Sequence, residues 1–252
     1  MGKMLHRWAG AIIMLGLAVS PGAKADPNAL WKIIDNRCVP HQRAGANPAP
    51  CALVDEKQGY AILKDLTGPS QYLLIPTARI TGIEDPKILG PGATNYFAEA
   101  WENRHFTEER LRLALPRPDI SLAVNSAYGR SQNQLHIHID CVRTDVAETL
   151  HTHEEVIGDT WHEIDLPPKS HPYLAMRISG DTLEGVNPFA LVAARGQAGH
   201  AMGRQTIVVV GTRFKDGTAG FYLLNGEASL AGLDSGSGEE LQDHTCAIAR
   251  RQ

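Results

Sequence analysis

The sequence predicts an α+β fold, in which helices pack on an antiparallel β-sheet. Short apolar or alternating runs, each bounded by Gly or Pro, indicate strands, and two of them are joined by a tight turn as a hairpin. Stretches with apolar residues at helical spacing lie between the strand pairs. The resulting order of two strands, a helix and two strands is typical of a sheet covered by helices.

Length and composition indicate one large folded domain or two small ones. The chain has 252 residues, of which 43% are hydrophobic and 21% are charged, as in soluble globular proteins. Its formal net charge of -4 is no signature of nucleic-acid binding, and no polybasic membrane-binding segment stands out. We therefore expect no nucleic-acid partner.

The first 25 residues have the pattern of an export signal. Lys3, His6 and Arg7 form a basic start, residues 8–19 form an uncharged apolar run, and Ala23-Lys24-Ala25 is a small-x-small cleavage motif. The apolar run is short for a membrane span, which needs about 20 residues. Residues 1–25 are therefore expected to be a cleaved signal peptide, with a retained N-terminal membrane anchor as the alternative.

The four cysteines are expected to be paired, because export leads to an oxidising compartment. Four cysteines allow three pairings. Cys38 and Cys51 flank a loop with Pro and Gly that can close locally, which favours a Cys38–Cys51 bridge and leaves Cys141 for Cys246. The other pairings and free buried thiols are the alternatives.

The first half of the mature chain, residues 26–143, is expected to carry the chemistry. Its predicted elements are a helix over 30–38, a loop through Pro40, Pro48 and Pro50, a hairpin of strands 59–64 and 71–76, a loop over 81–92, a helix from residue 94 or 95 to residue 113, and strands over 120–125 and 133–141. Thr94 or Asn95 caps the second helix, and Pro116 ends it.

The second half is expected to repeat part of this order. Residues 144–170 are interpreted as a polar connection with a short helix over 146–155. Residues 171–252 then contain a strand over 173–178, a helix over 187–202, a hairpin of strands 205–214 and 220–225, and a final helix over 239–250. This pattern predicts two related halves in one compact unit, the second degenerate.

The strand from Asn133 to Cys141 is the centre of the predicted site. Alternate side chains share a face of a strand, so one face is expected to present Gln134, His136, His138 and Asp140. The preceding residues 125–132 are rich in hydrogen-bond donors and include Gly129, which lets backbone approach a ligand. Donors beside two imidazoles predict a bound anion next to a nucleophile or proton carrier.

These segments resemble the signature of the histidine-triad (HIT) superfamily, in which three histidines alternate with apolar residues. From about residue 30 onward, the chain is similar to the bacterial CDP-diacylglycerol pyrophosphatase family of HIT-like hydrolases. The likeness rests on residues 60–69 (YAILKDLTGP), 71–77 (QYLLIPT), 129–133 (GRSQN), 136–139 (HIHI) and 242–246 (QDHTC). The resemblance implies a HIT-like antiparallel sheet with packed helices.

The same resemblance implies an activity and roles for residues. The reaction is hydrolysis of the pyrophosphate bond of CDP-diacylglycerol to CMP and phosphatidate, in phospholipid metabolism. His136, at the middle triad position, is then the nucleophile that forms a covalent nucleotidyl-histidine, and His138 contacts a phosphoryl or leaving oxygen. The residues expected to bind phosphate or nucleotide are Asn125, Gly129, Arg130, Ser131, Gln132, Gln134 and Lys64. The scheme requires no metal or cofactor.

One departure from the family pattern leaves alternatives open. Gln134 stands where the family has its first triad histidine, and Gln can donate a hydrogen bond but carries no titratable proton. We expect it to orient or bind. The alternatives are a HIT-like hydrolase or transferase of a soluble nucleotide, a non-catalytic nucleotide-binding module, and a zinc hydrolase with His136, His138 and Asp140 as ligands. Lys64 equally fits a solvated position, and His244 is expected at the surface.

The resemblance and the export signal together imply a location. An exported enzyme with this substrate is expected in the periplasm, at the outer face of the cell inner membrane, where it meets CDP-diacylglycerol at the membrane surface. The sequence indicates no particular oligomeric state.

Overall fold

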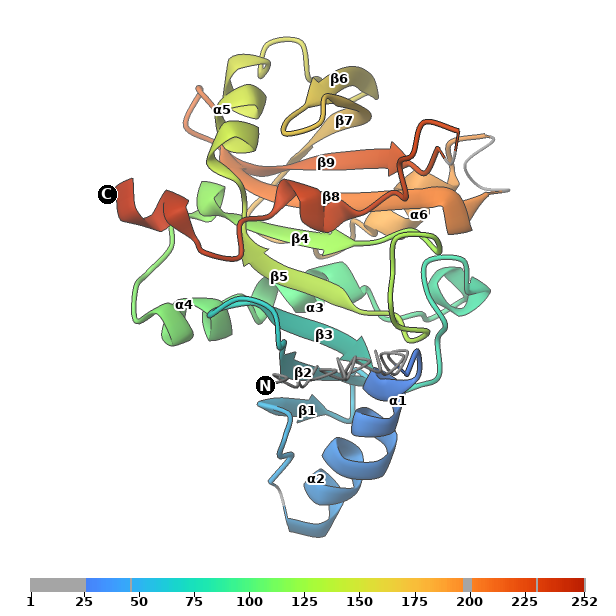
Figure 1. The fold of residues 1–252 in the computed structure, drawn as a ribbon. Coiled ribbons are helices and arrows are strands. Elements are labelled where there is room, and N and C mark those ends of the chain that lie inside the picture. The colour runs from blue at the N-terminus through green and yellow to red at the C-terminus, as the bar shows by residue number, and fades with distance from the viewer. Residues whose placement is uncertain (1–25, 46, 197–200, 230, 252) are drawn as a thin grey trace, which may run out of the picture.

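Nine strands form one antiparallel sheet in the part of the chain that the structure describes, which is residues 26–45, 47–196, 201–229 and 231–251. In this computed structural model the strands are β1 (Leu53–Asp55), β2 (Tyr60–Lys64), β3 (Tyr72–Pro76), β4 (Ile120–Val124), β5 (Ile137–Cys141), β6 (His162–Leu166), β7 (His171–Ser179), β8 (Gln205–Arg213) and β9 (Ala219–Glu227). Their order across the sheet is β1-β2-β3-β5-β4-β8-β9-β7-β6 (Figure 1). The predicted α+β fold with an antiparallel sheet is confirmed.

The helices are short and lie between the strands. The α-helices are α1 (Ala29–Ile33), α2 (Val39–Gly45), α3 (Tyr96–Glu102), α4 (His105–Leu111), α5 (Thr144–Thr152) and α6 (Pro188–Ala193). A π-helical turn, η1 (Ile34–Cys38), joins α1 to α2, and the 3-10 turns are η2 (Pro86–Leu89), η3 (Arg117–Asp119), η4 (Met202–Arg204), η5 (Gly238–Leu241) and η6 (Ala247–Arg251).

The first two predicted helices differ from the expectation in their extent. The N-terminal helix continues past residue 38 to Gly45, and Pro40 is accommodated beside the π turn, which already interrupts regular α-helical hydrogen bonding. The helix expected from residue 94 or 95 to residue 113 is two helices, α3 and α4. The break lies at Asn103, whose Nδ2 donates to the Glu99 carbonyl at 2.8 Å and to the Tyr60 hydroxyl at 2.9 Å. Asn95 caps α3 as predicted, accepting from Ala98 N at 3.3 Å.

The second half contains the larger corrections. β6 lies inside residues 144–170, which were expected to be a connection with a helix alone. α6 ends at Ala193, short of the expected residue 202, and residues 197–200 lie outside the described part. The prediction of a final helix over 239–250 is wrong, since the helical turns of this segment are 3-10 turns. Gln242 forms a β-bridge with Val142, and Cys246 is bonded to Cys141, so a continuous helix cannot form here.

One face of the sheet is covered by α3 and α6, which lie behind the sheet in Figure 1. The Phe97 and Phe189 rings of these helices pack at 4.9 Å between centroids, and Trp101 packs edge-on against Phe221 of β9 at 4.8 Å. All four side chains are fully buried or nearly so. This apolar layer joins the two halves of the sheet in one core.

The opposite face of the sheet presents His138. The strand register aligns Leu63, Leu73 and His138 across β2, β3 and β5, so these side chains share a face. The α1–α2 segment covers the β1–β3 end of this face, and residues 235–246, named here the C-terminal strap, cross β4 and β8 (Figure 1). The predicted site lies between these two covers.

A disulfide fastens each cover. Cys38 in η1 is bonded to Cys51 before β1, and Cys141 at the end of β5 is bonded to Cys246 at the end of the strap. The favoured pairing is therefore confirmed, and no cysteine of the described residues is free.

The strand order has an internal regularity. Reading outward from the central β4–β8 pair, one direction gives β4, β5, β3 and β2, and the other gives β8, β9, β7 and β6. α3 lies in the sequence between β3 and β4, and α6 lies between β7 and β8. Each half thus has the order β-β-α-β-β, with β1 added at one edge.

Candidate active site

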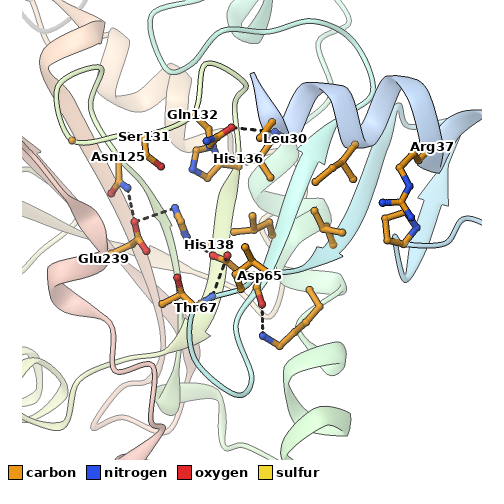
Figure 2. Close-up of a pocket in the computed structure, with 18 residues that line it drawn as sticks. Leu30, Arg37, Asp65, Thr67, Asn125, Ser131, Gln132, His136, His138 and Glu239 are labelled. Carbon is orange, nitrogen blue, oxygen red and sulfur yellow. Dashed lines mark hydrogen bonds and ion pairs between the residues drawn. The ribbon is translucent and has the colours of Figure 1, made fainter. Parts of the chain in front are cut away.

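A cavity of about 540 Å³ lies beside the histidine strand. Its walls come from α1 and η1, from the turn between β2 and β3, from residues 125–132 and from the C-terminal strap. Figure 2 shows His136 and His138 at the centre, Asn125 and Glu239 at one end, and Arg37 at the other. The volume lies within the range of small-molecule sites.

His136 has one ring nitrogen fixed by backbone. Its Nδ1 lies 2.7 Å from the carbonyl oxygen of Gln134, so Nδ1 carries the proton and donates it. Nε2 then carries the lone pair, and it forms no hydrogen bond with the described residues. Burial lowers the pKa of His136 below its usual value, against the opposing hydrogen bond to Gln134. The imidazole is therefore neutral and oriented at neutral pH, as a nucleophilic imidazole needs to be.

His138 lies against His136 and is close to three other side chains, of which Asp65 and Glu239 line the cavity. The two imidazole centroids are 4.8 Å apart. Gln71 Nε2 donates to His138 Nδ1 at 2.8 Å, which places the proton on Nε2, and that nitrogen lies 3.3 Å from Glu239 Oε1. Asp65 Oδ2 is 3.9 Å from Nδ1. Burial lowers the pKa of His138 well below its usual value, and charge on His136 or His244 lowers it further.

Asn125 connects the donor-rich loop to the C-terminal strap. Its Nδ2 donates to Glu239 Oε1 at 2.7 Å, and its Oδ1 accepts from Gly238 N at 2.8 Å. One amide thus holds both the strap backbone and the Glu239 carboxylate. Gly238 lies so close to Val208 that a Cβ there would approach it to 2.9 Å, so the strap is pressed against β8.

A second acid–imidazole pair lies beyond Glu239. His244 Nδ1 donates to the buried Asp140 Oδ2 at 2.8 Å, and His244 Nε2 lies 3.9 Å from Glu239 Oε2. This hydrogen bond raises the pKa of His244, whereas burial raises that of Asp140. The sequence predicted a surface position for His244. Its side chain is 30% exposed, and it also lies beside Asp140 and Glu239 of the site.

Two predicted ligand residues make their contacts away from the main cavity. Gln134 is fully buried, and its Nε2 donates to the carbonyls of Pro76 and Ala78 at 3.0 and 2.8 Å. Arg130 forms a bidentate ion pair with Glu84, with both N···O distances 2.6 Å. Neither side chain is part of the cavity wall described above.

The remaining predicted ligand residues lie on the cavity, with some of their groups already engaged. Ser131 is exposed at the wall. Gln132 accepts from Leu30 N at 3.0 Å, which ties α1 to the donor-rich loop. Gly129 N donates to Ser126 Oγ at 3.1 Å within the turn. Lys64 Nζ donates to the carbonyls of Asp65 and Gly68, and burial lowers its pKa.

Four residues of the site were not predicted in these roles: Gln71, Asp65, Glu239 and His244. Gln71 and Asp65 flank the turn of the predicted hairpin, which brings them next to β5. Glu239 reaches the site from a segment far away in sequence. The only sequence signal was the stretch of residues 242–246, whose Cys246 places the strap once the disulfide is known.

The donor geometry gives little support to a metal centre. Among the described residues, the only group of three metal-ligand types with converging atoms is Asp140, Cys141 and Cys246. Both cysteine sulfurs are joined in a disulfide and offer no thiolate. His136, His138 and Asp140, the predicted zinc set, do not form such a group.

Within the residues that the structure describes, no helix is long and apolar enough to span a bilayer. The expected signal peptide or anchor, residues 1–25, lies outside the described residues.

Comparison with known proteins decides the family. The family model of CDP-diacylglycerol pyrophosphatase matches residues 25–250. The chain belongs to this family. A curated relative from Yersinia pestis, named CDP-diacylglycerol pyrophosphatase, is 42% identical over 225 residues, which cover 89% of this chain and 86% of the relative. The likeness therefore includes both halves of the sheet and the C-terminal strap.

Proposed function

We propose that this chain is a CDP-diacylglycerol diphosphatase, which hydrolyses the pyrophosphate bond of CDP-diacylglycerol to CMP and phosphatidate. Membership of the family supports the substrate and the reaction class. The observation that carries the mechanism is the His136 ring, which has Nδ1 bound to the Gln134 carbonyl and Nε2 left for attack beside the cavity.

In the first step, the lone pair of His136 Nε2 attacks the phosphorus of the CMP portion. The bond from that phosphorus to the bridging oxygen breaks, and phosphatidate leaves with the electron pair. A covalent nucleotidyl-histidine results, with its positive charge delocalised over the ring and the Gln134 carbonyl accepting from Nδ1. In the second step, water attacks the same phosphorus, the P–N bond breaks, and CMP is released.

His138 is placed to bind the reacting phosphoryl group. Gln71 fixes its tautomer, so Nε2–H points toward the Glu239 side of the cavity and can donate to a phosphoryl oxygen. Ser131 adds a hydroxyl at the wall. Because Arg130 is bound to Glu84, we propose that it shapes the donor loop and contributes positive potential rather than a direct phosphate contact.

The other end of the cavity fits the nucleoside. Leu30 and Ile33 of α1 lie on one wall, and Leu63 and Leu73 lie on the sheet. These apolar side chains can sandwich a flat base. A carboxylate repels phosphate but accepts hydrogen bonds from hydroxyl groups, so Asp65 is suited to the ribose.

Gln134 fits an orienting role. Its two donated hydrogen bonds fix the end of β3 against the segment that leads into the histidine strand. A side chain that binds two carbonyls without titrating serves this purpose as well as an imidazole. We therefore propose that the departure from the HIT pattern does not remove a proton carrier.

The architecture is proposed to be HIT-like, with two related halves. The supporting observation is the matching order outward from β4 and β8, with α3 and α6 in equivalent places. The proposed division is a catalytic half over 26–143, a connection over 144–170 and a degenerate half over 171–252. β9, which takes the place of β5, contains no histidine.

We propose that the protein acts in the periplasm, at the outer face of the inner membrane, where the lipid portion of the substrate resides. The two disulfides support an oxidising compartment. The basic, apolar and small-x-small sequence of residues 1–25 supports an export signal.

The direct test is an assay of the purified full chain with CDP-diacylglycerol in mixed micelles and excess EDTA, measuring CMP and phosphatidate. We expect chelator-resistant turnover that is lost in His136→Asn. Loss of wild-type turnover with EDTA, and recovery with zinc, would support the metal alternative instead. Turnover of a water-soluble CDP ester without turnover of the lipid, or CMP binding without turnover of either, would overturn the proposal.

A further inference from the structure

The Glu239 carboxylate is the point on which the nitrogens of the site converge. Asn125 Nδ2 donates to Oε1 at 2.7 Å, and His138 Nε2 lies 3.3 Å from the same oxygen. Gln71 Nε2 and His244 Nε2 lie 3.5 and 3.9 Å from Oε2. Figure 2 shows Glu239 beside His138 at the edge of the cavity, with Asn125 above it.

The neighbouring Glu240 shows what a purely structural glutamate does in this strap. Its side chain points into the second half, where Oε1 accepts from the Tyr173 hydroxyl at 2.9 Å and from His171 Nδ1 at 2.8 Å. Lys169 Nζ lies 3.1 Å from its Oε2. Glu240 is not part of the cavity wall, whereas Glu239 is.

The proposed reaction needs a base in its second step. An in-line displacement brings each entering group to the side of phosphorus opposite the group that leaves. Phosphatidate departs opposite His136, so the hydrolytic water enters from the vacated side. His138 has its Nδ1 lone pair engaged by Gln71, so its Nε2, 3.3 Å from Glu239 Oε1, carries the proton and acts as a donor rather than a base.

We propose that Glu239 is the general base that activates this water, an inference that rests on the proposed function. The carboxylate removes a proton from the water as the O–P bond forms, and the P–N bond breaks with its electron pair returning to His136 Nε2. The proton held by Glu239 then passes to solvent at the open edge of the cavity, where the Glu239 side chain is 26% exposed.

His244 and Asp140 act as positioning residues for this base. The Asp140 carboxylate binds His244 Nδ1 and favours the imidazolium, which presents Nε2–H toward Glu239. At this distance the imidazolium attracts the Glu239 carboxylate and holds it in position beside the cavity. The Cys141–Cys246 disulfide lies next in sequence to Asp140 and near His244, and it holds the pair in place.

The test is pre-steady-state release of phosphatidate and CMP by full-length Glu239→Gln. The amide keeps an oxygen for Asn125 but removes the base. We expect a burst of phosphatidate of about one equivalent per site, then turnover slowed by on the order of 100-fold or more, with CMP retained on the protein. Hydroxylamine, a nucleophile that needs less base assistance than water, is expected to release the retained CMP and restore much of the rate.

Glu240→Gln is the matched control and is expected to show wild-type kinetics below its melting temperature. Slow phosphatidate release without a burst in Glu239→Gln would overturn the assignment, since the loss would then lie in the first step. Wild-type kinetics in this variant would overturn it equally. Failure of the proposed function is recognised separately, because the wild-type protein itself would then release no phosphatidate.

Discussion

The β1–β5 half of the sheet and the β6–β9 half follow the same order of elements, but they differ in what their central strands carry. β5 presents His138 to a cavity, with His136 just before it, whereas β9 is mostly apolar and buried between its two end residues and contains no histidine. The cavity beside the first half's histidines is about 540 Å³, whereas the cavity that Asn225 and Glu227 of β9 line in the second half is about 190 Å³ and contains no histidine.

The second half nevertheless reaches the site through the chain that follows it. The C-terminal strap follows β9 in the sequence, crosses β8 and β4, and places Glu239 and His244 beside the histidine strand. The fold thus brings together the proposed nucleophile and the proposed base from segments about 100 residues apart, since Glu239 is 103 positions after His136. The comparison teaches that one half supplies the reacting strand and the other closes the site over it.

The largest expected effect is on turnover, and it distinguishes a histidine of the first half from a histidine of the second half. His136→Asn removes the nucleophile, and we expect turnover to fall on the order of 10⁴-fold, about 5.4 kcal/mol of transition-state stabilisation. His162→Asn, at an exposed position of β6, is expected to leave the rate unchanged. Steady-state kinetics with circular dichroism on both variants checks this. Equal losses in the two variants would remove the distinction between the halves.

The two disulfides give the next largest effect, because they close loops of different length. The Cys141–Cys246 separation is 105 residues and the Cys38–Cys51 separation is 13. Loop-closure entropy gives about 4.7 kcal/mol for a loop of about 100 residues and about 3 kcal/mol for one of about 15. We expect the Cys141→Ser/Cys246→Ser double variant to lose more stability in urea unfolding than Cys38→Ser/Cys51→Ser.

The same pair of variants separates the roles of the two covers in the reaction. Release of the strap frees His244 and Glu239, so the second step of turnover is expected to slow more in Cys141→Ser/Cys246→Ser than in the other double variant. An unchanged rate of CMP release from this variant, measured well below its unfolding midpoint, would contradict the role assigned to the strap.

The adjacent residues Glu239 and Glu240 allow the same comparison between the site and the second half within one segment. Glu240→Gln weakens charge-assisted hydrogen bonds from Tyr173 and His171 in a nearly buried position. We expect a stability loss of about 2 kcal/mol, or a fall in Tm of about 6 °C, without loss of turnover. Glu239→Gln is expected to show the reverse, a slow rate with a nearly unchanged Tm. Thermal unfolding of both proteins measures the contrast.

The smallest expected effect is the pH dependence of stability. His136 and His138 have lowered pKa values in the folded state, so below about pH 6.5 the unfolded chain binds more protons and stability falls. The raised pKa of His244 has the opposite sign: its contribution is complete below about pH 6.5 and is lost as pH rises through the folded pKa.

Urea unfolding between about pH 5 and about pH 8 checks both signs, with a slope of at most about 1.4 kcal/mol per pH unit for each histidine. His138→Gln is expected to flatten the acid side of the profile, and His244→Gln the alkaline side. An acid side that is as steep in His138→Gln as in the wild type would show that other groups are responsible.

Local patterns predicted the histidine half of the molecule. Alternation predicted β5, turn residues predicted the β2–β3 hairpin, and the Asn95 cap predicted the start of α3. These features depend on neighbours in sequence, so a short window contains their cause. The disulfide pairing followed from a cysteine pair close in sequence and the elimination that it allowed.

Features that depend on distant contacts were missed. Helical spacing over 239–250 suggested a helix, but the Val142–Gln242 bridge and the second disulfide hold this segment in a different conformation. β6 was missed because many of its residues are polar. It is an edge strand with one exposed face, so such residues are tolerated there. Arg130 was predicted to bind phosphate, but it is paired with Glu84. Glu84 lies in a loop without regular structure, so no local pattern indicated this contact.

The most direct test of the account is to trap the covalent intermediate during turnover. The full-length wild-type protein, mixed with CDP-diacylglycerol and quenched in denaturant at a pH that preserves phosphoramidates, is digested and its peptides are analysed by mass spectrometry. The account predicts one CMP attached at His136, a larger trapped fraction in Glu239→Gln, and none in His136→Asn. Turnover at the full rate with no adduct, or an adduct on a different residue, would contradict it.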